Sequence, residues 1–344
     1  MHKFYYEFVL YSISKFTMFI RKTINFFLKK KEDFHMYSLS DFHCDTITRL
    51  EQKQENLYEN TGHIDIKRLK TFLSPLMTFA VCLDGEGKEC LQETMDYIDY
   101  FREELKVNKE HISLVRTYDE ILKNKENKKI SAILAIEGGE ALEGNIKNIK
   151  KLCDVGVRIF TLTWNYKNEI GNGTLAEGKE GLSPFGFEVI KELERHKMII
   201  DVSHLNEAGF WDVVNTTETA IVATHSNCRA LCDNPRNLTD KQIIEIAERK
   251  GLIGMNLFPD FINEGKKASL MDIVKHIDYI VELVGIDYVC LGSDFDGVRY
   301  LPNGANSILS LHNLREILLM KYSEKETEKI ICGNILRFME NFLV

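Results

Sequence analysis

Histidine and carboxylate side chains follow several short apolar runs of this sequence, and His43 and Asp45 are the first of them. These two residues are two positions apart, so on an extended strand both side chains leave the same face. An imidazole and a carboxylate on one face at a strand end make half of a metal site. One such pair also arises by chance, so its interpretation depends on what the other apolar runs supply.

Four later apolar runs end in residues of the same types. These residues are Glu137, His204, His225, and the pair Asp294 and Asp296. Several imidazoles and carboxylates brought together would be costly to bury without a compensating cation. Nitrogen and oxygen ligands without thiolate suit zinc, manganese or iron, and a carboxylate such as Glu137 can bridge two ions about 3.5–4 Å apart. We therefore predict a metal site at these ends.

The apolar runs alternate with amphipathic helical stretches, which is typical of parallel β/α units. Eight such units in 344 residues predict a single-domain α/β fold, a (β/α)8 barrel over residues 36–344, with its chemistry at the carboxyl ends of the strands. An open doubly wound sheet is the alternative, but it would place a glycine-rich phosphate loop after the first strand, and none is there. The expected strands are Tyr37–His43, Pro75–Leu83, Ile130–Glu137, Arg158–Trp164, Met198–His204, Ala220–His225, Leu252–Phe258 and Tyr288–Asp294.

Helix signals and a long loop separate these strands. Ser183 before Pro184 predicts a helix start, and capping boxes are expected at Thr239 with Gln242 and at Ser323 with Glu326. Ser269 is expected to cap a helix that ends at Gly285. The loop Tyr166–Leu182 is long, charged and rich in glycine, which is compatible with a mobile flap.

The remaining histidines and cysteines are interpreted as structural. Eight cysteines without a C-x-x-C pair are typical of free thiols in a reducing compartment. Cys44 should point to the strand face opposite His43, and Cys228 and Cys232 should lie in the core. Asp201 alternates in phase with Ser203 rather than with His204, so we expect it to be a supporting carboxylate.

Charge and composition limit the partners. A net charge of −8 disfavours nucleic acid, which needs a basic face. Residues 1–35 carry a local charge of +4, which leaves −12 for the remainder of the chain. Charged residues interrupt this segment, so none of its uncharged runs approaches the ~20 apolar residues that a membrane span needs. Three interpretations stay open for this N-terminal extension: a surface-bound amphipathic helix, a packing helix on the barrel, or a start-site artefact with Met36 as the true start.

The strand ends and their neighbours resemble the membrane (renal) dipeptidase family of binuclear zinc peptidases, which have amidohydrolase-like barrels. The resemblance runs from about Met36 to the C-terminus. Its stretches are Asp41-Phe42-His43-Cys44-Asp45-Thr46, Ile136-Glu137-Gly138-Gly139, Asp201-Val202-Ser203-His204, Thr224-His225-Ser226, Pro235-Arg236-Asn237, Gly292-Ser293-Asp294-Phe295-Asp296-Gly297 and Gly333-Asn334-Ile335-Leu336-Arg337.

The resemblance implies two zinc ions per chain. His43 and Asp45 would bind one ion, His204 and His225 would bind the other, and Glu137 would bridge them. Two zinc ions lower the pKa of a shared water, which then attacks the peptide carbonyl. The implied activity is hydrolysis of dipeptides.

Two further residues acquire roles from the same resemblance. Asp294 would take the proton of the attacking water and return it to the leaving amine. Arg236 would hold the free C-terminal carboxylate of the dipeptide through two parallel hydrogen bonds. From the sequence alone, Arg236 is equally compatible with a surface residue that follows Pro235.

Two positions depart from the family pattern. Trp164 stands where mammalian members carry a histidine that contacts the substrate carbonyl. Stabilisation of the oxyanion would then come from zinc, from the indole N–H or from the neighbouring Asn165. Glu140 stands where the mammalian enzymes have another histidine, which we expect to change the charge of the site mouth. Both changes bear on the substrate range more than on hydrolysis.

The sequence therefore predicts a cytoplasmic metallo-dipeptidase with a small dipeptide substrate, and a homodimer stays an open prediction. No C-terminal anchor signal of the kind found in mammalian members is apparent. A related amidohydrolase that acts on another small amide, a β-lactam or an N-acyl amino acid, is the first alternative. A non-catalytic ligand-binding barrel is the second. Arg236 distinguishes dipeptide hydrolysis from the first alternative, because a substrate without a free carboxylate would not need it. The intact ligand set argues against the second alternative.

Overall fold

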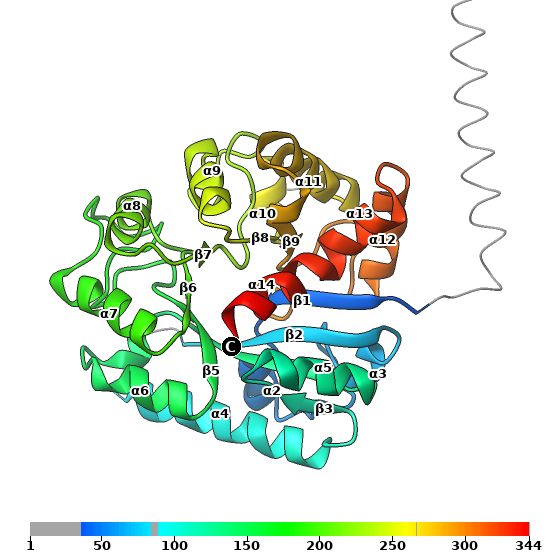
Figure 1. Cartoon of the computed structure of the whole chain (residues 1–344), viewed down its shortest axis with the longest axis horizontal. Coiled ribbons are helices and arrows are strands. Elements are labelled where there is room, and N and C mark those ends of the chain that lie inside the picture. The colour runs from blue at the N-terminus through cyan, green and yellow to red at the C-terminus, as the bar shows by residue number, and fades with distance from the viewer. Residues whose placement is uncertain (1–35, 84–88, 266, 344) are drawn as a thin grey trace, which may run out of the picture. The chain divides into compact units, whose positions relative to one another are not determined.

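Eight principal strands run parallel around the centre of the described chain, with helices outside them (Figure 1). The computed structural model describes residues 36–83, 89–265 and 267–343, and Ser38–Val344 forms one compact unit. The N-terminal extension expected over residues 1–35 lies outside the described residues. The principal strands are β1 (Ser38–Cys44), β2 (Leu73–Cys82), β4 (Ile130–Glu137), β5 (Val157–Thr161), β6 (Ile199–Asp201), β7 (Ile221–Val222), β8 (Ile253–Met255) and β9 (Val289–Leu291).

The barrel is closed by two isolated bridges. Parallel pairing joins β1, β2, β4, β5, β6 and β7 in that order, and a second parallel pair joins β8 to β9. A bridge between Ala223 and Ile253 connects β7 to β8, and a bridge between Cys44 and Phe295 connects the end of β9 to β1. The predicted (β/α)8 architecture is confirmed, and the open doubly wound alternative is wrong.

One short strand was not expected from the sequence. β3 (Ile112–Leu114) pairs with Ile130–Ala132 at the beginning of β4. β5 pairs with β4 only from Leu134 onward, so β3 occupies the edge that β5 leaves open. Three residues, of which two are only partly buried, give no clear alternation from which to predict a strand.

Helices follow the strands and cover the outside of the barrel. The α-helices are α2 (Thr46–Lys53), α3 (Ile66–Leu69), α4 (Cys90–Val107), α5 (Tyr118–Glu126), α6 (Lys147–Asp154), α7 (Pro184–Arg195), α8 (Glu207–Thr216), α9 (Asp240–Glu248), α10 (Pro259–Ile262), α11 (Leu270–Val284), α12 (Ser310–Leu319), α13 (Glu324–Glu328) and α14 (Asn334–Phe342). Single turns are η1 (Glu140–Leu142), η2 (Ile286–Tyr288) and the π-turn η3 (Lys329–Gly333). In the described part of the chain, none of the helices combines the length and apolar character that crossing a membrane requires.

The predicted helix starts are confirmed. Ser183 accepts the N–H of Gly186 at the start of α7, and capping boxes begin α9 and α13. At the start of α11, the Asp272 carboxylate accepts both the N–H and the hydroxyl of Ser269. Each cap satisfies helix-end donors and so fixes where the loop from the preceding strand must end.

Helix α14 packs against one end of the barrel core. Its Ile335, Phe338 and Met339 join inward-facing residues of the strands in a single buried cluster, and α14 crosses the middle of the barrel in Figure 1. Asn334 donates to the carbonyl of Val289, the first residue of β9, so α14 covers the end where the strands begin. The polar residues at the opposite, carboxyl ends of the strands are left to form a site.

Candidate metal centre

Glu137, the last residue of β4, lies at the centre of a buried cluster. Its Oε1 is 2.8 Å from Nε2 of His204 and 3.2 Å from Nε2 of His225. Its Oε2 is 3.3 Å from Nε2 of His43, which is in turn 3.4 Å from Oδ2 of Asp45. All of these side chains are buried, and none is more than 10% exposed. The structure thus brings together the ligands that the strand ends predicted.

The donor atoms of this cluster fit a metal ion. Nε2 of His204 and Nε2 of His225 are 2.8 Å apart. Within the described residues, no hydrogen bond reaches Nε2 of His43 or Oδ1 of Asp45. Buried lone pairs that face one another are unfavourable without a proton or a cation between them. Ligand atoms of His43, Glu137 and His225 all lie within 4.8 Å of one another, which is close enough for one ion to be shared.

The other ring nitrogens of two histidines are held by hydrogen bonds. Nδ1 of His204 is 2.8 Å from Oδ1 of Asn165. Nδ1 of His225 is 2.8 Å from Oγ1 of Thr224, whose own proton goes to Asp201 at 2.6 Å. Both acceptors place the proton on Nδ1 and leave Nε2 free to bind metal. Asp201 therefore has the supporting position that its phase predicted.

The electrostatics of the cluster favour neutral imidazoles on one side. Burial, assisted by the Arg236 guanidinium, lowers the pKa of His204 to about 4. Burial and the nearby His43 lower the pKa of His225 well below its ordinary value. Burial also opposes charge on His43, but Glu137 and Asp45 raise its pKa well above the ordinary value. Neutral His204 and His225 are ready to bind metal, whereas an ion must displace the proton of His43.

Asp294 faces the same cluster from the loop after β9. It can share an ion site with His43 and Asp45, and its Oδ2 accepts a hydrogen bond of 2.8 Å from Asn256. Burial raises its pKa. A Cβ at Gly297 would lie 2.1 Å from Oδ2 of Asp45 and 2.4 Å from Oδ1 of Asp294, so only glycine leaves room for both carboxylates.

Two of the site residues have a left-handed backbone. The φ angle is 65° at His204 and 59° at Asp294. Such angles are unfavourable for residues with a Cβ and are concentrated at functional sites. The chain turns here shortly after β6 and β9. These strands therefore end before His204 and Asp294, which were expected to be the last residues of longer strands.

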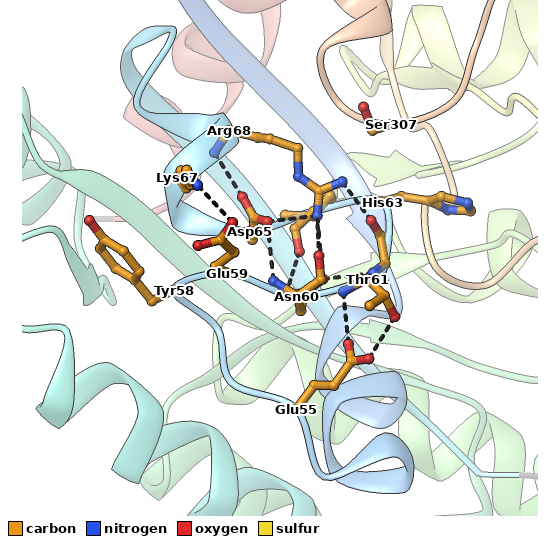
Figure 2. Close-up of polar contacts among 12 residues, drawn as sticks. Glu55, Tyr58, Glu59, Asn60, Thr61, His63, Asp65, Lys67, Arg68 and Ser307 are labelled. Carbon is orange, nitrogen blue, oxygen red and sulfur yellow. Dashed lines mark hydrogen bonds and ion pairs between the residues drawn. The ribbon is translucent and has the colours of Figure 1, made fainter.

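Asp296 lies outside the cluster, although the sequence grouped it with Asp294. Its carboxylate accepts the hydroxyl of Thr46 at 2.7 Å and the N–H of His63 at 2.6 Å. His63 belongs to the loop between α2 and α3, which is fastened by contacts of Asn60 and Arg68 (Figure 2). Asp296 thus anchors that loop beside the site and does not face the metal ligands.

Arg236 is buried rather than exposed, which removes the surface interpretation. Only 4% of the residue is accessible, and its guanidinium lies 5.2 Å from the ring centroid of Phe261. Nη2 donates to the carbonyl of His225 at 3.3 Å and Nη1 to Oγ of Ser226 at 3.4 Å. The cation is therefore next to the predicted ligand His225.

Trp164 and Glu140, the two departures from the family pattern, both lie near residues of the cluster. The Trp164 ring lies 6.2 Å from the ring of His204 and contacts Tyr166 edge-on at 5.8 Å. Burial raises the pKa of Glu140, which accepts a hydrogen bond from Asn168. The loop that starts at Tyr166 is tied down by bridges such as Gly173 to Leu205. A Cβ at Gly173 would lie 2.1 Å from the Trp164 carbonyl, which requires glycine there.

The sequence profile of the membrane dipeptidase family, peptidase family M19, matches residues 33–342. This chain belongs to that family. The family consists of metallopeptidases, so the enzyme is a metallo-dipeptidase, a hydrolase that acts on peptide bonds. The resemblance found in the sequence is confirmed.

Two relatives, one of them a dipeptidase, are similar to part of this chain. An uncharacterized protein from the pqqA 5' region of Klebsiella pneumoniae is 36% identical over 228 residues, which cover 63% of this chain and 84% of that protein. The dipeptidase aclJ of Aspergillus oryzae is 32% identical over 216 residues, which cover 61% of this chain and 51% of that protein.

Two crystal structures share the fold. Dipeptidase AC, a metallopeptidase of family M19, superimposes with a TM-score of 0.84 at 25% identity, covering 90% of this chain and 99% of its own. A metallopeptidase from Rhodobacter sphaeroides, bound to a phosphinate mimic of L-Ala-D-Ala, gives a TM-score of 0.81 at 24% identity, covering 90% of this chain and 100% of its own.

Three residues of this metallo-dipeptidase that touch the site were not singled out from the sequence. Asn256 donates to Asp294, Thr224 supports His225, and Cys82 lies beside Asp45 and Glu137. An asparagine or threonine at a strand end is too common to notice. The position of Cys82 becomes meaningful only when the register of β2 against β4 is known.

Proposed function

We propose that this metallo-dipeptidase is zinc-dependent and cleaves dipeptides that have a free C-terminal carboxylate. The proposed centre holds two zinc ions, one on His43 and Asp45 and one on His204 and His225, with Glu137 as the shared ligand. The nitrogen and oxygen donors, the close approach of the imidazoles and the unpartnered buried atoms support this assignment.

The residues around the centre have the properties that hydrolysis requires. When bound, zinc supplies Lewis acidity that polarises the peptide carbonyl and acidifies water. Asp294 takes the proton from the attacking water and delivers it to the amine that leaves. The raised pKa of its carboxyl brings it closer to neutral pH, and the hydrogen bond from Asn256 orients it.

The buried guanidinium of Arg236 is the observation that carries the substrate assignment. It contacts one backbone carbonyl and one hydroxyl, and Nε has no hydrogen-bond partner among the described residues. Burial lowers its pKa to about 10, so it stays positively charged at neutral pH. An uncompensated buried charge is expensive. The carboxylates of Asp294, Glu137 and Asp201 favour the charge without an ion pair to it among the described residues. A substrate carboxylate would supply a countercharge in direct contact and would fix the C-terminus of a dipeptide.

The test compares a dipeptide with the same dipeptide carrying a C-terminal amide, on enzyme whose zinc content is measured. We expect two zinc ions per chain, chelator-sensitive cleavage, and a strong preference for the free acid. Arg236→Ala should raise KM for the free acid by about 10- to 100-fold, in line with ~1.5–3 kcal/mol for a hydrogen bond to a charged group. The amide should be affected little.

Arg229→Ala serves as the matched control, because Arg229 belongs to the same loop and binds the carbonyls of Asn237 and Pro235. An equal rise of KM in both variants would assign the effect to loop distortion. Zinc without cleavage of any L,L- or L,D-dipeptide would favour a different amide substrate and direct attention to Trp164. Absence of bound metal after zinc is supplied would overturn the proposal.

A further inference from the structure

Cys82 reaches the metal centre from a strand that contributed none of the predicted ligands. It is the last residue of β2 and pairs in register with Glu137 of β4. On β2 it is in phase with Leu76 and Ala80, which belong to the buried cluster inside the barrel. Its side chain is therefore directed inward, at the same level as the carboxylate of Glu137.

The sulfur lies close to the carboxylates of Asp45 and Glu137. Sγ of Cys82 and carboxylate oxygens of Asp45 and Glu137 all lie within 4.8 Å of one another. Asp45 is only 7% exposed, and its Oδ1 receives no hydrogen bond from any described residue. The Cys82 thiol has a long contact of 3.8 Å to the carbonyl of Leu83, and burial raises the pKa of the thiol, assisted by its interaction with the Glu137 carboxylate. A buried carboxylate oxygen without a partner, a second carboxylate and a thiol thus surround a common point, as metal ligands do.

We propose that Cys82 is a sulfur ligand of the metal ion held by His43, Asp45 and Glu137. The proposal rests on the metal centre described under Proposed function and adds a ligand to it. The sulfur binds as a thiolate, and the thiol proton leaves to solvent when the ion enters. This revises the expectation from the sequence that the ligands include no thiolate.

A thiolate changes which ion the site prefers. Together with Asp45 and the shared Glu137, it supplies three negative charges to offset the four positive charges of two divalent ions in a buried centre. Sulfur ligands favour zinc, cadmium and cobalt, whereas sites made of oxygen and nitrogen ligands accept manganese more readily. Cys82 would therefore tune this side of the centre toward thiophilic ions, and the His204 and His225 side would not share that preference.

The decisive experiment is a cobalt titration of the metal-free, full-length protein followed by absorption spectroscopy. Cobalt bound by any of these ligands absorbs in the visible, but a thiolate adds an intense charge-transfer band in the near ultraviolet. We expect this band in the wild-type protein and in Cys153→Ser. We expect Cys82→Ser to retain the visible bands and lose the near-ultraviolet band.

Cys153 provides the control because it is also only partly buried but lies elsewhere, near Arg158 and His196. A near-ultraviolet band that persists in Cys82→Ser would overturn the inference while leaving the metal centre intact. Visible bands in the wild type without any near-ultraviolet band would overturn it equally. Failure of the wild type to bind cobalt at all would overturn the metal centre itself.

A second measurement does not require a variant. Zinc should protect Cys82 of the wild-type protein from alkylation, as read by mass spectrometry, and should leave Cys153 reactive.

A third measurement compares the metal preference of variants. In Cys82→Ser, or in Cys82→Ala if the serine variant folds poorly, the preference for cadmium over manganese should fall by about 10- to 100-fold. Equal alkylation of Cys82 with and without zinc, or an unchanged preference, would contradict a sulfur ligand.

Discussion

Asp294 differs from the other carboxylates of the centre in its partners. Asp45 and Glu137 face imidazole nitrogens, whereas Asp294 accepts a hydrogen bond from Asn256 and lies in a left-handed turn after β9. Its position beside His43 and Asp45 lets it reach a water molecule at the centre without being the principal metal ligand. A carboxylate placed in this way is suited to move protons.

Asp294→Asn should keep the metals and lose turnover. The amide preserves the shape and the contact with Asn256, but it cannot take a proton from water. We expect kcat to fall by about 100- to 10,000-fold, the usual contribution of a general acid–base group. Elemental analysis of the same preparation checks that metal content is unchanged. Turnover close to that of the wild type would remove Asp294 from the mechanism.

At the scale of single residues, the sequence predicted which candidate ligands the structure brings together but not their surroundings. His43, Glu137 and His225 could be recognised because their side chains are unusual at the ends of apolar runs. Gly297 and Cys82 could not, since the importance of each depends on which atoms lie opposite. The closeness of Gly297 to two carboxylates and the alignment of Cys82 with Glu137 are properties of the strand register.

At the scale of the elements, Asp201 couples three strand ends. Its carboxylate accepts the hydroxyls of Thr161 and Thr224 at 2.6 Å each, and the N–H groups of Ser203 and Thr224 at 2.9 Å each. Thr161 ends β5, Asp201 ends β6, and Thr224 follows β7. The histidines after β6 and β7 are therefore held by one buried group, which explains how strands of three and two residues can position ligands.

Helix α12 carries a histidine that should make stability depend on pH. The His312 ring stacks on Phe72 with centroids 4.1 Å apart, and Nε2 is 3.1 Å from Oγ1 of Thr71. Burial, assisted by Arg315, lowers the pKa of His312 to about 4. In the unfolded chain, the histidine binds its proton near pH 6.5, well before the folded protein does. The unfolded state is therefore favoured as protons are added, and the free energy of unfolding falls as the pH drops from about 6.5 to about 4.

Replacing the ring should remove this part of the pH dependence. His312→Phe keeps an aromatic surface against Phe72, so its free energy of unfolding should fall less than that of the wild type between pH 6.5 and pH 4. Urea unfolding at several pH values measures the difference. His111→Phe, at a partly exposed histidine that contacts Tyr58, is the control. Identical slopes for wild type and His312→Phe would show that His312 does not contribute.

At the scale of the whole molecule, the order of the strands and the barrel were predictable, but the particular contacts that close the barrel were not. Eight apolar runs separated by helical patterns allow few arrangements. The expected strands extended too far toward their carboxyl ends, because the backbone turns away from the strand direction at residues such as His204 and Asp294. β1 and β9 are the first and last strands of the barrel along the sequence, and no local sequence pattern indicates the contacts that join them.

The seam between β1 and β9 depends on buried Asp41. Oδ1 of Asp41 accepts the N–H of Ser293 at 2.9 Å and the N–H of His43 at 3.2 Å. Next to it, Asp294 donates its N–H to the carbonyl of His43, and Asp45 donates to that of Phe295. Residues 41–45 and 293–295 thus close the barrel, and they also carry His43, Asp45 and Asp294 of the candidate metal centre. A change that weakens this closure is therefore expected to disturb the centre.

Asp41→Ala should open this seam. Two buried N–H groups would lose their acceptor, at about 1–3 kcal/mol each, so we expect the free energy of unfolding to fall by about 2–6 kcal/mol. Asp41→Asn keeps an oxygen at Oδ1 and should cost much less, because burial already raises the pKa of Asp41 and a neutral amide is easier to bury. Urea unfolding gives the energies, and hydrogen exchange at Ser293 locates the change. If the alanine and asparagine variants are equally stable, the seam is held by the backbone contacts alone, and the metal centre would tolerate changes at Asp41.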